Sequence, residues 1–283
     1  TVANLFAGNF SDATDAVSGG SSANTLAGVF ITANAATATQ GKWQWQASGS
    51  SSWTDIATSG LSDSTSLFLA ASTKLRFLPT ADWNGTPGSL TTRLAENSGS
   101  ALTNGSSINV ATNGGTTAYS ASTISLGTSV TSVNDVPVRT SSAPAAISVN
   151  EDSNNTTAVS LGLSSLAYSS GGGSDESTQS FTYTLTAIPA FITVYKADGT
   201  TQVNTNDTLS LTELQGLKYK TNANANGSGN LTWTVQDSGG TASGGVDTLS
   251  QSLSISVSAV NDAPIASGSA SLAAVLEDNA SPA

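Results

Sequence analysis

The chain has 283 residues, a formal net charge of −11, and no histidine or cysteine. These absences exclude Ser-His triads, cysteine nucleophiles and ordinary zinc sites. The acidic balance argues against nucleic acids and anionic membrane surfaces as partners, because both require clusters of lysine and arginine. No apolar run of 18 residues is present, so we expect no membrane insertion. Catalysis by a carboxylate pair is the remaining enzymatic option, but no pair stands out, and we expect a protein that is not an enzyme.

Short strands with alternating apolar and polar residues are predicted along the chain, most clearly at 181–188, 231–237 and 251–260. In the last of these, Leu253, Ile255 and Val257 alternate with serines, as in a strand with one buried face. Turn dipeptides separate the predicted strands, and no stretch has the periodicity of a helix. The pattern predicts an all-β protein made of β-sandwiches.

An internal repeat divides the chain into modules. Residues 69–99 align with residues 211–240 with one gap, so that Asn84-Gly85 corresponds to Asn226-Gly227 and Glu96 to Asp237. Each copy then runs into a VND-x-P motif, which we call the first linker (133–137) and the second linker (260–264). We therefore expect a first module at 1–137, a second at 138–264, and the first strand of a following module at 265–283.

The C-terminal segment repeats the opening of the second module, because Glu277-Asp278 follows the second linker much as Glu151-Asp152 follows the first. The first module has no such strand of its own. Two explanations stay open. The chain is a piece of a long tandem array, or identical subunits assemble by lending strand 271–283 to a neighbour, with Leu272, Ala274 and Leu276 packed into its sandwich.

The two linkers, Glu151 and the tryptophan-containing strand before Asp237 resemble the cadherin-like repeats of bacterial RTX-type giant adhesins. The resemblance implies tandem Ig-like or cadherin-like β-sandwich modules joined end to end, outside the cell or on the bacterial surface. It also implies Ca²⁺ between successive modules, and calcium prefers the carboxylate, amide and carbonyl oxygens found there. The implied ligands are Glu151, Asp175, Glu176, Asp237, Asn261 and Asp262 for the second module, and Asp12, Asp15, Glu96, Asn134, Asp135 and a copy of Glu277 for the first.

The sequence thus predicts a non-enzymatic, calcium-rigidified extender of a secreted or surface-anchored adhesin. Its partners would be neighbouring repeats or identical subunits. A fibre subunit that donates strand 271–283 is one alternative. A carbohydrate- or peptide-binding module is another: Trp43, Trp45 and Trp53 would form a platform for host or biofilm glycans, unless they pack within the sandwich. An Asn-Asp pair before proline can also be a simple turn.

Overall fold

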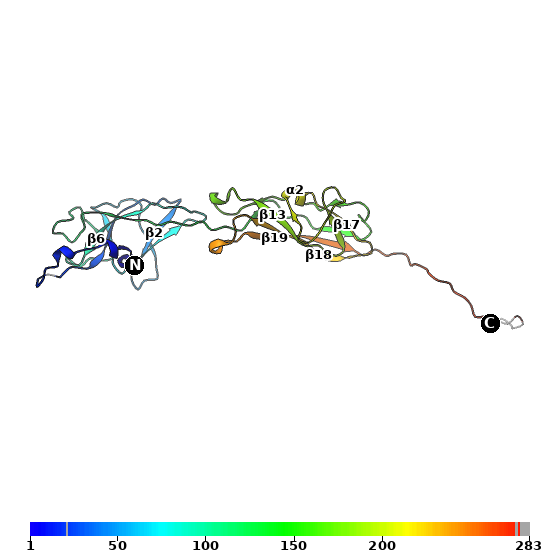
Figure 1. The fold of residues 1–283 in the computed structure, drawn as a ribbon, viewed down its shortest axis with the longest axis horizontal. Coiled ribbons are helices and arrows are strands. Elements are labelled where there is room, and N and C mark those ends of the chain that lie inside the picture. Colours follow the sequence, from blue (N-terminus) through cyan, green and yellow to red (C-terminus); the bar gives the residue numbers. More distant parts are fainter. Residues whose placement is uncertain (21, 275–276, 278–283) are drawn as a thin grey trace. The chain divides into compact units, whose positions relative to one another are not determined.

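The computed structural model describes residues 1–20, 22–274 and 277. The chain divides into two compact units (Figure 1). Unit 1 comprises Thr1–Val136, Ser170–Gln179 and Ser238–Asp247, and unit 2 comprises Pro137–Ser169, Ser180–Asp237 and Thr248–Ala283. Two segments from the range predicted for the second module, 170–179 and 238–247, therefore group with unit 1. The module boundaries themselves stay a prediction.

Unit 1 contains two antiparallel sheets, with strand orders β7-β4-β1-β6-β8 and β3-β2-β5. The strands are β1 (Leu26–Asn34), β2 (Gly41–Gln46), β3 (Thr54–Asp55), β4 (Ser66–Ala70), β5 (Lys74–Pro79), β6 (Leu90–Glu96), β7 (Ser107–Ile108) and β8 (Ile124–Leu126). Short helices lie in its N-terminal segment and loops, namely α1 (Val2–Phe6), η1 (Ala7–Asn9), η2 (Ala13–Asp15), η3 (Ser174–Glu176) and η4 (Ala242–Gly244).

The core of unit 1 forms where the two sheets turn their apolar faces inward. In β6, Leu90, Thr92 and Leu94 are buried and alternate with half-buried residues, which is the expected period of two. Helix α1 contributes Val2 and Phe6, both at most 1% exposed, to the main cluster of buried residues. The first residues of the chain therefore pack into the sandwich rather than extending from it.

Unit 2 has a five-stranded sheet, β10-β19-β18-β13-β16, a four-stranded sheet, β11-β17-β14-β15, and a two-stranded ribbon, β12-β9. The elements are β9 (Val138–Arg139), β10 (Ile147–Asn150), β11 (Val159–Ser160), β12 (Tyr168–Ser169), β13 (Phe181–Ala187), β14 (Ile192–Tyr195), β15 (Gln202–Val203), β16 (Thr208–Leu209), α2 (Leu211–Gln215), β17 (Lys218–Thr221), β18 (Gly227–Asp237) and β19 (Thr248–Ser258).

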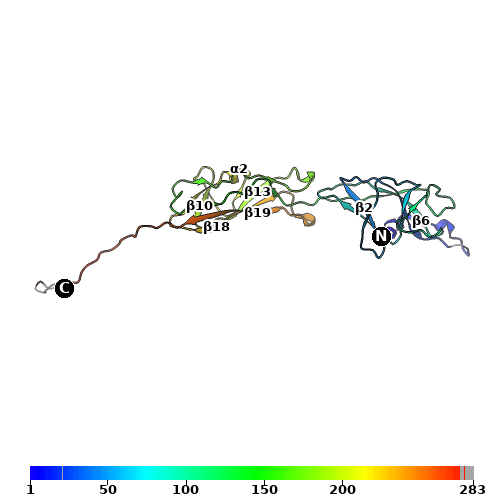
Figure 2. The same ribbon diagram turned by 180° about the vertical axis from the view of Figure 1, so that it is seen from behind.

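The long hairpin of β18 and β19 forms the centre of unit 2. Leu231, Trp233 and Val235 of β18 are completely buried, and the polar residues between them are not, as the sequence predicted. The Trp233 indole N–H donates a hydrogen bond to the Tyr168 hydroxyl at 3.1 Å. Strand β10 pairs with β19 in parallel, so the first strand of this sheet lies beside its last (Figure 2).

The structure confirms the all-β, sandwich-type fold. The first strand of a following module stays a prediction, because only part of 265–283 is described; within that part, residues 265–274 contain no strand and Leu272 is 98% exposed. A lone strand leaves its backbone groups and one apolar face without partners, which explains why this stretch forms none by itself. Leu276 and Asp278 lie outside the described residues. Among the described residues, no helix has the length and hydropathy needed to cross a membrane.

Candidate functional site

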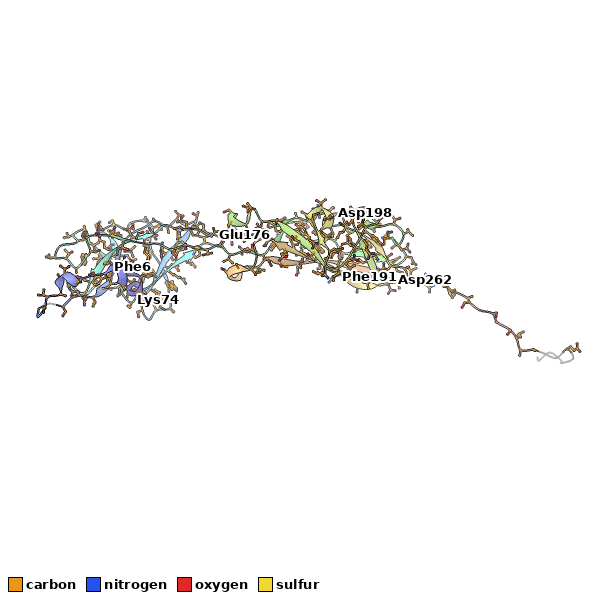
Figure 3. All side chains as sticks on the ribbon, in the orientation of Figure 1. Phe6, Lys74, Glu176, Phe191, Asp198 and Asp262 are labelled. Atoms are coloured by element: carbon orange, nitrogen blue, oxygen red, sulfur yellow. The ribbon has the colours of Figure 1, made fainter. Side chains whose placement is uncertain are left out.

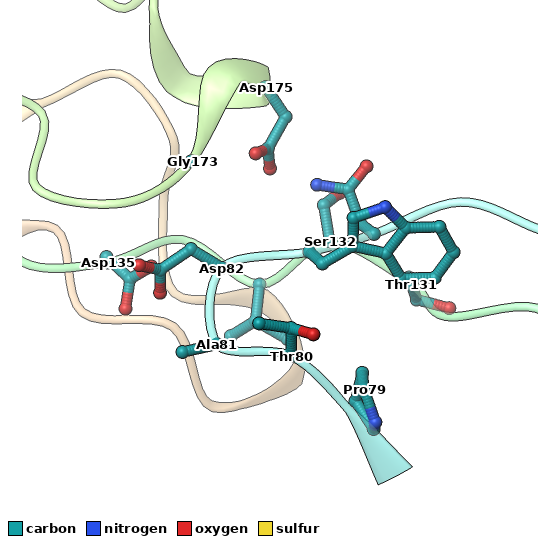
Figure 4. Close-up of a pocket in the computed structure, with 12 residues that line it drawn as sticks. Pro79, Thr80, Ala81, Asp82, Thr131, Ser132, Asp135, Gly173 and Asp175 are labelled. Atoms are coloured by element: carbon teal, nitrogen blue, oxygen red, sulfur yellow. The ribbon is translucent and has the colours of Figure 1, made fainter. Parts of the chain in front are cut away.

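A cavity of about 300 Å³ lies in unit 1 beside the first linker (Figure 4). Three carboxylates from separate segments line it: Asp82 after β5, Asp135 in the linker, and Asp175 in η3. Asp82 has a positive φ of 59°, a conformation that aspartate tolerates better than most residues. The sequence had singled out Asp135 and Asp175, but not Asp82. The turn signal Asn84-Gly85 marks its neighbourhood without indicating its role.

Glu176 fixes the first linker from within unit 1. Its side chain is only 2% exposed. Its Oε1 accepts a hydrogen bond from the Asp135 N–H at 2.6 Å, and its Oε2 accepts one from the Gly172 N–H at 3.0 Å. The glycine run before η3 permits this approach, because a Cβ on Gly172 would lie 2.3 Å from Asp135 Oδ2. Glu176 therefore holds the linker backbone, in addition to any role toward a cation.

Asn134 ties the same linker to the 238–247 segment. Its side-chain amide donates to the Val246 carbonyl at 2.9 Å and accepts from Gln179 Nε2 at 2.7 Å. The Val246 N–H donates to the Asn134 carbonyl at 3.0 Å. A Cβ on Gly239 would lie 1.8 Å from Asn134 Oδ1, so that glycine is required by contact. Within unit 1, the asparagine of the motif therefore connects the first linker to the 238–247 segment.

The donor chemistry beside the first linker fits a hard cation such as calcium. Among the described residues, Asp82, Asp135, Asp175 and Glu176 form no ion pair with lysine or arginine. A buried carboxylate such as Glu176 is costly unless it is hydrogen-bonded or paired with positive charge. However, no group of three or more acidic side chains within the described part of the chain converges closely enough to hold a metal ion. Backbone carbonyl oxygens would have to supply much of any coordination shell.

Glu151 makes the corresponding contact at the second linker, within unit 2. It is 3% exposed. Its Oε1 accepts from the Val260 N–H at 2.7 Å, and its Oε2 accepts from Asn226 Nδ2 at 3.3 Å. Its backbone carbonyl accepts from the Thr221 hydroxyl at 2.6 Å. Asn261 and Asp262, the other predicted ligands at this linker, are exposed, and Asn261 Nδ2 donates to the Asp262 carbonyl at 3.2 Å (Figure 3 labels Asp262).

The predicted ligand groupings need correction. Asp175 and Glu176 do not join Glu151 at the second linker, because they belong to unit 1 and lie beside the first. Asp237 also lies away from the second linker. It is the last residue of β18, whereas the linker follows the C-terminal end of β19, which pairs with the first residues of β18. Glu96 is likewise away from the first linker. It ends β6, whereas the linker follows residues 126–130, which pair with the start of β6 and with Gly85 before it. Antiparallel neighbours place their C-terminal ends at opposite ends of a sheet, which the alignment of the two repeats does not reveal.

The remaining predicted residues lie away from the linkers. Asp12 accepts a hydrogen bond from the Asn24 N–H at 2.6 Å, and the neighbouring Thr25 N–H donates to Asn97 beside Glu96. Asp15 lies exposed in η2. Asp12 therefore lies near the Glu96 end of β6. Glu277 is exposed.

The three tryptophans do not form one platform. Trp43 is buried, and its indole N–H donates to the Gly88 carbonyl at 2.8 Å, so it packs within the sandwich. The half-buried ring of Trp53 is covered by Arg76, whose guanidinium carbon lies 4.1 Å from the ring centroid. Trp45 alone lines a cavity, of about 350 Å³, together with Leu61 and Leu67. Glycan binding stays a prediction for Trp45.

No protein-family model matches the sequence, and no curated protein matches it. Among solved structures, the chain is similar to the crystal structure of the CupB6 tip adhesin from Pseudomonas aeruginosa, with a TM-score of 0.24 and 9% sequence identity. The similarity covers 85% of this chain and 87% of that chain. A likeness at this TM-score carries no argument about the site or its function.

Proposed function

We propose that this chain is a non-enzymatic structural part of an extracellular, adhesin-like protein, and that calcium stiffens its first linker. The observation that supports this most is the set of carboxylates around the first linker, with Glu176 buried beside it and no lysine or arginine paired with them among the described residues. The VND-x-P resemblance to cadherin-like repeats of RTX adhesins supports the same function.

In this proposal, Asp82, Asp135 and Asp175 would hold the cation together with nearby backbone oxygens. Bound calcium would supply the positive charge that offsets repulsion among these carboxylates. Glu176 would keep the linker backbone in place through its two N–H contacts, and Asn134 would hold the 238–247 segment against it. Extracellular calcium sites commonly have dissociation constants of about 10⁻⁴–10⁻³ M, which suits a site that fills outside the cell.

Calcium titration of the full chain tests the proposal. We expect binding by isothermal titration calorimetry, a higher melting temperature, and a scattering profile that indicates a stiffer linker, all reversed by EDTA. Asp135→Asn and Asp175→Asn should each weaken binding by about tenfold or more, which corresponds to about 1.4 kcal/mol. Asp55→Asn is the matched control, because Asp55 is an exposed carboxylate of unit 1 outside the cavity. Identical melting and scattering in calcium and in EDTA would refute the proposal.

A further inference from the structure

Each unit has a five-stranded sheet of similar arrangement, but the described residues of unit 1 include no counterpart of β10, the first strand of that sheet in unit 2. In unit 1, Leu90 pairs with Leu126 and Gly85 bridges to Val130. In unit 2, the equivalent pairs are Leu231 with Leu253 and Gly227 with Val257. Strand β8 is therefore the counterpart of β19. In unit 2 the outer edge of β19 is covered by β10, whereas among the described residues β8 ends its sheet.

The second sheet shows the same gap. Strand β17 is covered by β11 in unit 2, while its counterpart β5 is an edge strand among the described residues of unit 1. The residues that face the gap are correspondingly open. Leu75, Phe77, Leu126 and Val130 are only half-buried, whereas their counterparts Leu217, Tyr219, Leu253 and Val257 are at most 3% exposed.

The cavity beside the first linker corresponds to the position that Glu151 fills in unit 2. Glu151 accepts hydrogen bonds from Asn226 and the Val260 N–H. The residues equivalent to these two donors in unit 1 are Asn84 and Val133, and both line the cavity of about 300 Å³. Among the described residues, the β8 edge of unit 1 is therefore uncovered. It lies beside a cavity lined by Asn84 and Val133, the counterparts of the two residues that donate hydrogen bonds to Glu151.

We propose that β8 and this cavity bind residues 271–278 of a second copy of the chain, as a parallel strand with Glu277 in the place of Glu151. The inference concerns assembly and does not depend on calcium. The C-terminal segment has the required pattern. Glu277 follows Pro264 by thirteen positions, and Glu151 follows Pro137 by fourteen. Aligned on the glutamates, Ala273 and Val275 take the places of Ile147 and Val149, whose side chains pack against the core of unit 2. This register reverses the face expected from the sequence, because it turns Leu272, Ala274 and Leu276 outward.

The described part of the segment is available for such pairing, because Leu272 is 98% exposed and Ile265 is 94% exposed. Strand addition uses backbone hydrogen bonds for affinity and alternate side chains for register. The three aspartates of the cavity would repel Glu277. Pairing should still occur in EDTA, because it rests on backbone hydrogen bonds. If the cavity also binds calcium, the cation would offset this repulsion, and association should be stronger in calcium than in EDTA. Strand pairing and calcium binding can accordingly fail independently.

The test compares two lysine variants of the full chain that differ only in the face of the donated strand. Val275→Lys places a charge toward the core, and Ala274→Lys places the same charge outward, where β10 has the exposed Ser148. Neither position lies within the described folded strands, so both variants should fold normally. Sedimentation velocity over a concentration series should show self-association of the parent chain and of Ala274→Lys, and at least about tenfold weaker association of Val275→Lys.

Amide exchange provides a second readout. In a mixture with excess synthetic peptide 265–283, residues 124–133 of the chain should become protected, and the Val275→Lys peptide should protect them less. A chain that stays monomeric at all concentrations, or equal weakening by both variants, would overturn the proposal. Protection of β8 that does not depend on chain concentration would assign the edge to the chain's own C-terminal segment, and would equally overturn donation between copies.

Discussion

At the scale of single residues, the two buried glutamates do more than supply charge. Glu151 and Glu176 each accept a hydrogen bond from a linker backbone N–H, and each is at most 3% exposed. The sequence singled out both as calcium ligands through the VND-x-P resemblance. The sequence could not reveal their backbone contacts. A glutamate that accepts hydrogen bonds from a linker and a glutamate that binds a cation occur in similar sequence contexts.

Replacing Glu176 by glutamine tests the backbone role. One carboxylate oxygen becomes an NH₂ group, so a donor must face the N–H of either Asp135 or Gly172. We expect a loss of about 1–3 kcal/mol in the free energy of unfolding, measured by urea denaturation in EDTA. Glu96→Gln is the control, since Glu96 is half-buried and accepts a hydrogen bond from the Ser98 hydroxyl. An equal effect of the two substitutions would contradict the assigned role.

At the scale of elements, alternation and turn residues predicted the main strands well. Phe181–Ala187, Gly227–Asp237 and Thr248–Ser258 are strands where period-two patterns were strongest. The short helix α2 was not predicted, because five residues carry too little periodicity. Its signal is local: Ser210 caps the helix, and Glu213 accepts a hydrogen bond from the Ser210 N–H in return. The ligand groupings failed at this scale, because strand direction decides which ends meet.

The cap of α2 gives a prediction about acid stability. The Lys196 ammonium and the Ser210 N–H and hydroxyl lower the pKa of Glu213 from 4.5 to about 2. Because the folded-state pKa is depressed, this stabilisation is fully present above pH 4.5 and is lost as the pH falls toward 2. We expect Glu213→Gln to flatten the fall in melting temperature of unit 2 over this window and to leave the curve above it parallel to that of the parent chain. An unchanged acid slope would refute the prediction.

At the scale of the whole molecule, the main feature is a repeated sheet arrangement in which the described residues of unit 1 include no counterpart of β10. The sequence predicted the repeat and the absence of the first strand from unit 1, because Glu151 has no counterpart there. It could not show that the open edge leads into a cavity lined by Asn84 and Val133, since these residues come from distant segments. Calcium, the extracellular setting and the partner stay predictions.

The uncovered edge should make equivalent core residues unequal. Leu253 is 1% exposed beneath β10, whereas its counterpart Leu126 is half-buried. Leu253→Ala should reduce the free energy of unfolding of unit 2 by about 2–5 kcal/mol. Leu126→Ala should reduce that of unit 1 by less, because part of its side chain already contacts water. Differential scanning calorimetry of both variants, below the concentration at which the chain associates, measures the contrast. Equal losses would argue that the β8 edge is covered.

The parallel pairing of β10 with β19 has a mechanical consequence. The chain enters this sheet through β10 and leaves it through β19, and their four residue pairs run in the same direction. Tension applied to the two ends of unit 2 therefore pulls these strands past one another. The hydrogen bonds between them are loaded together in shear, rather than broken one after another, which slows forced unfolding. Unit 1 would gain the same clamp from a donated strand, so that force would pass from copy to copy through paired backbone.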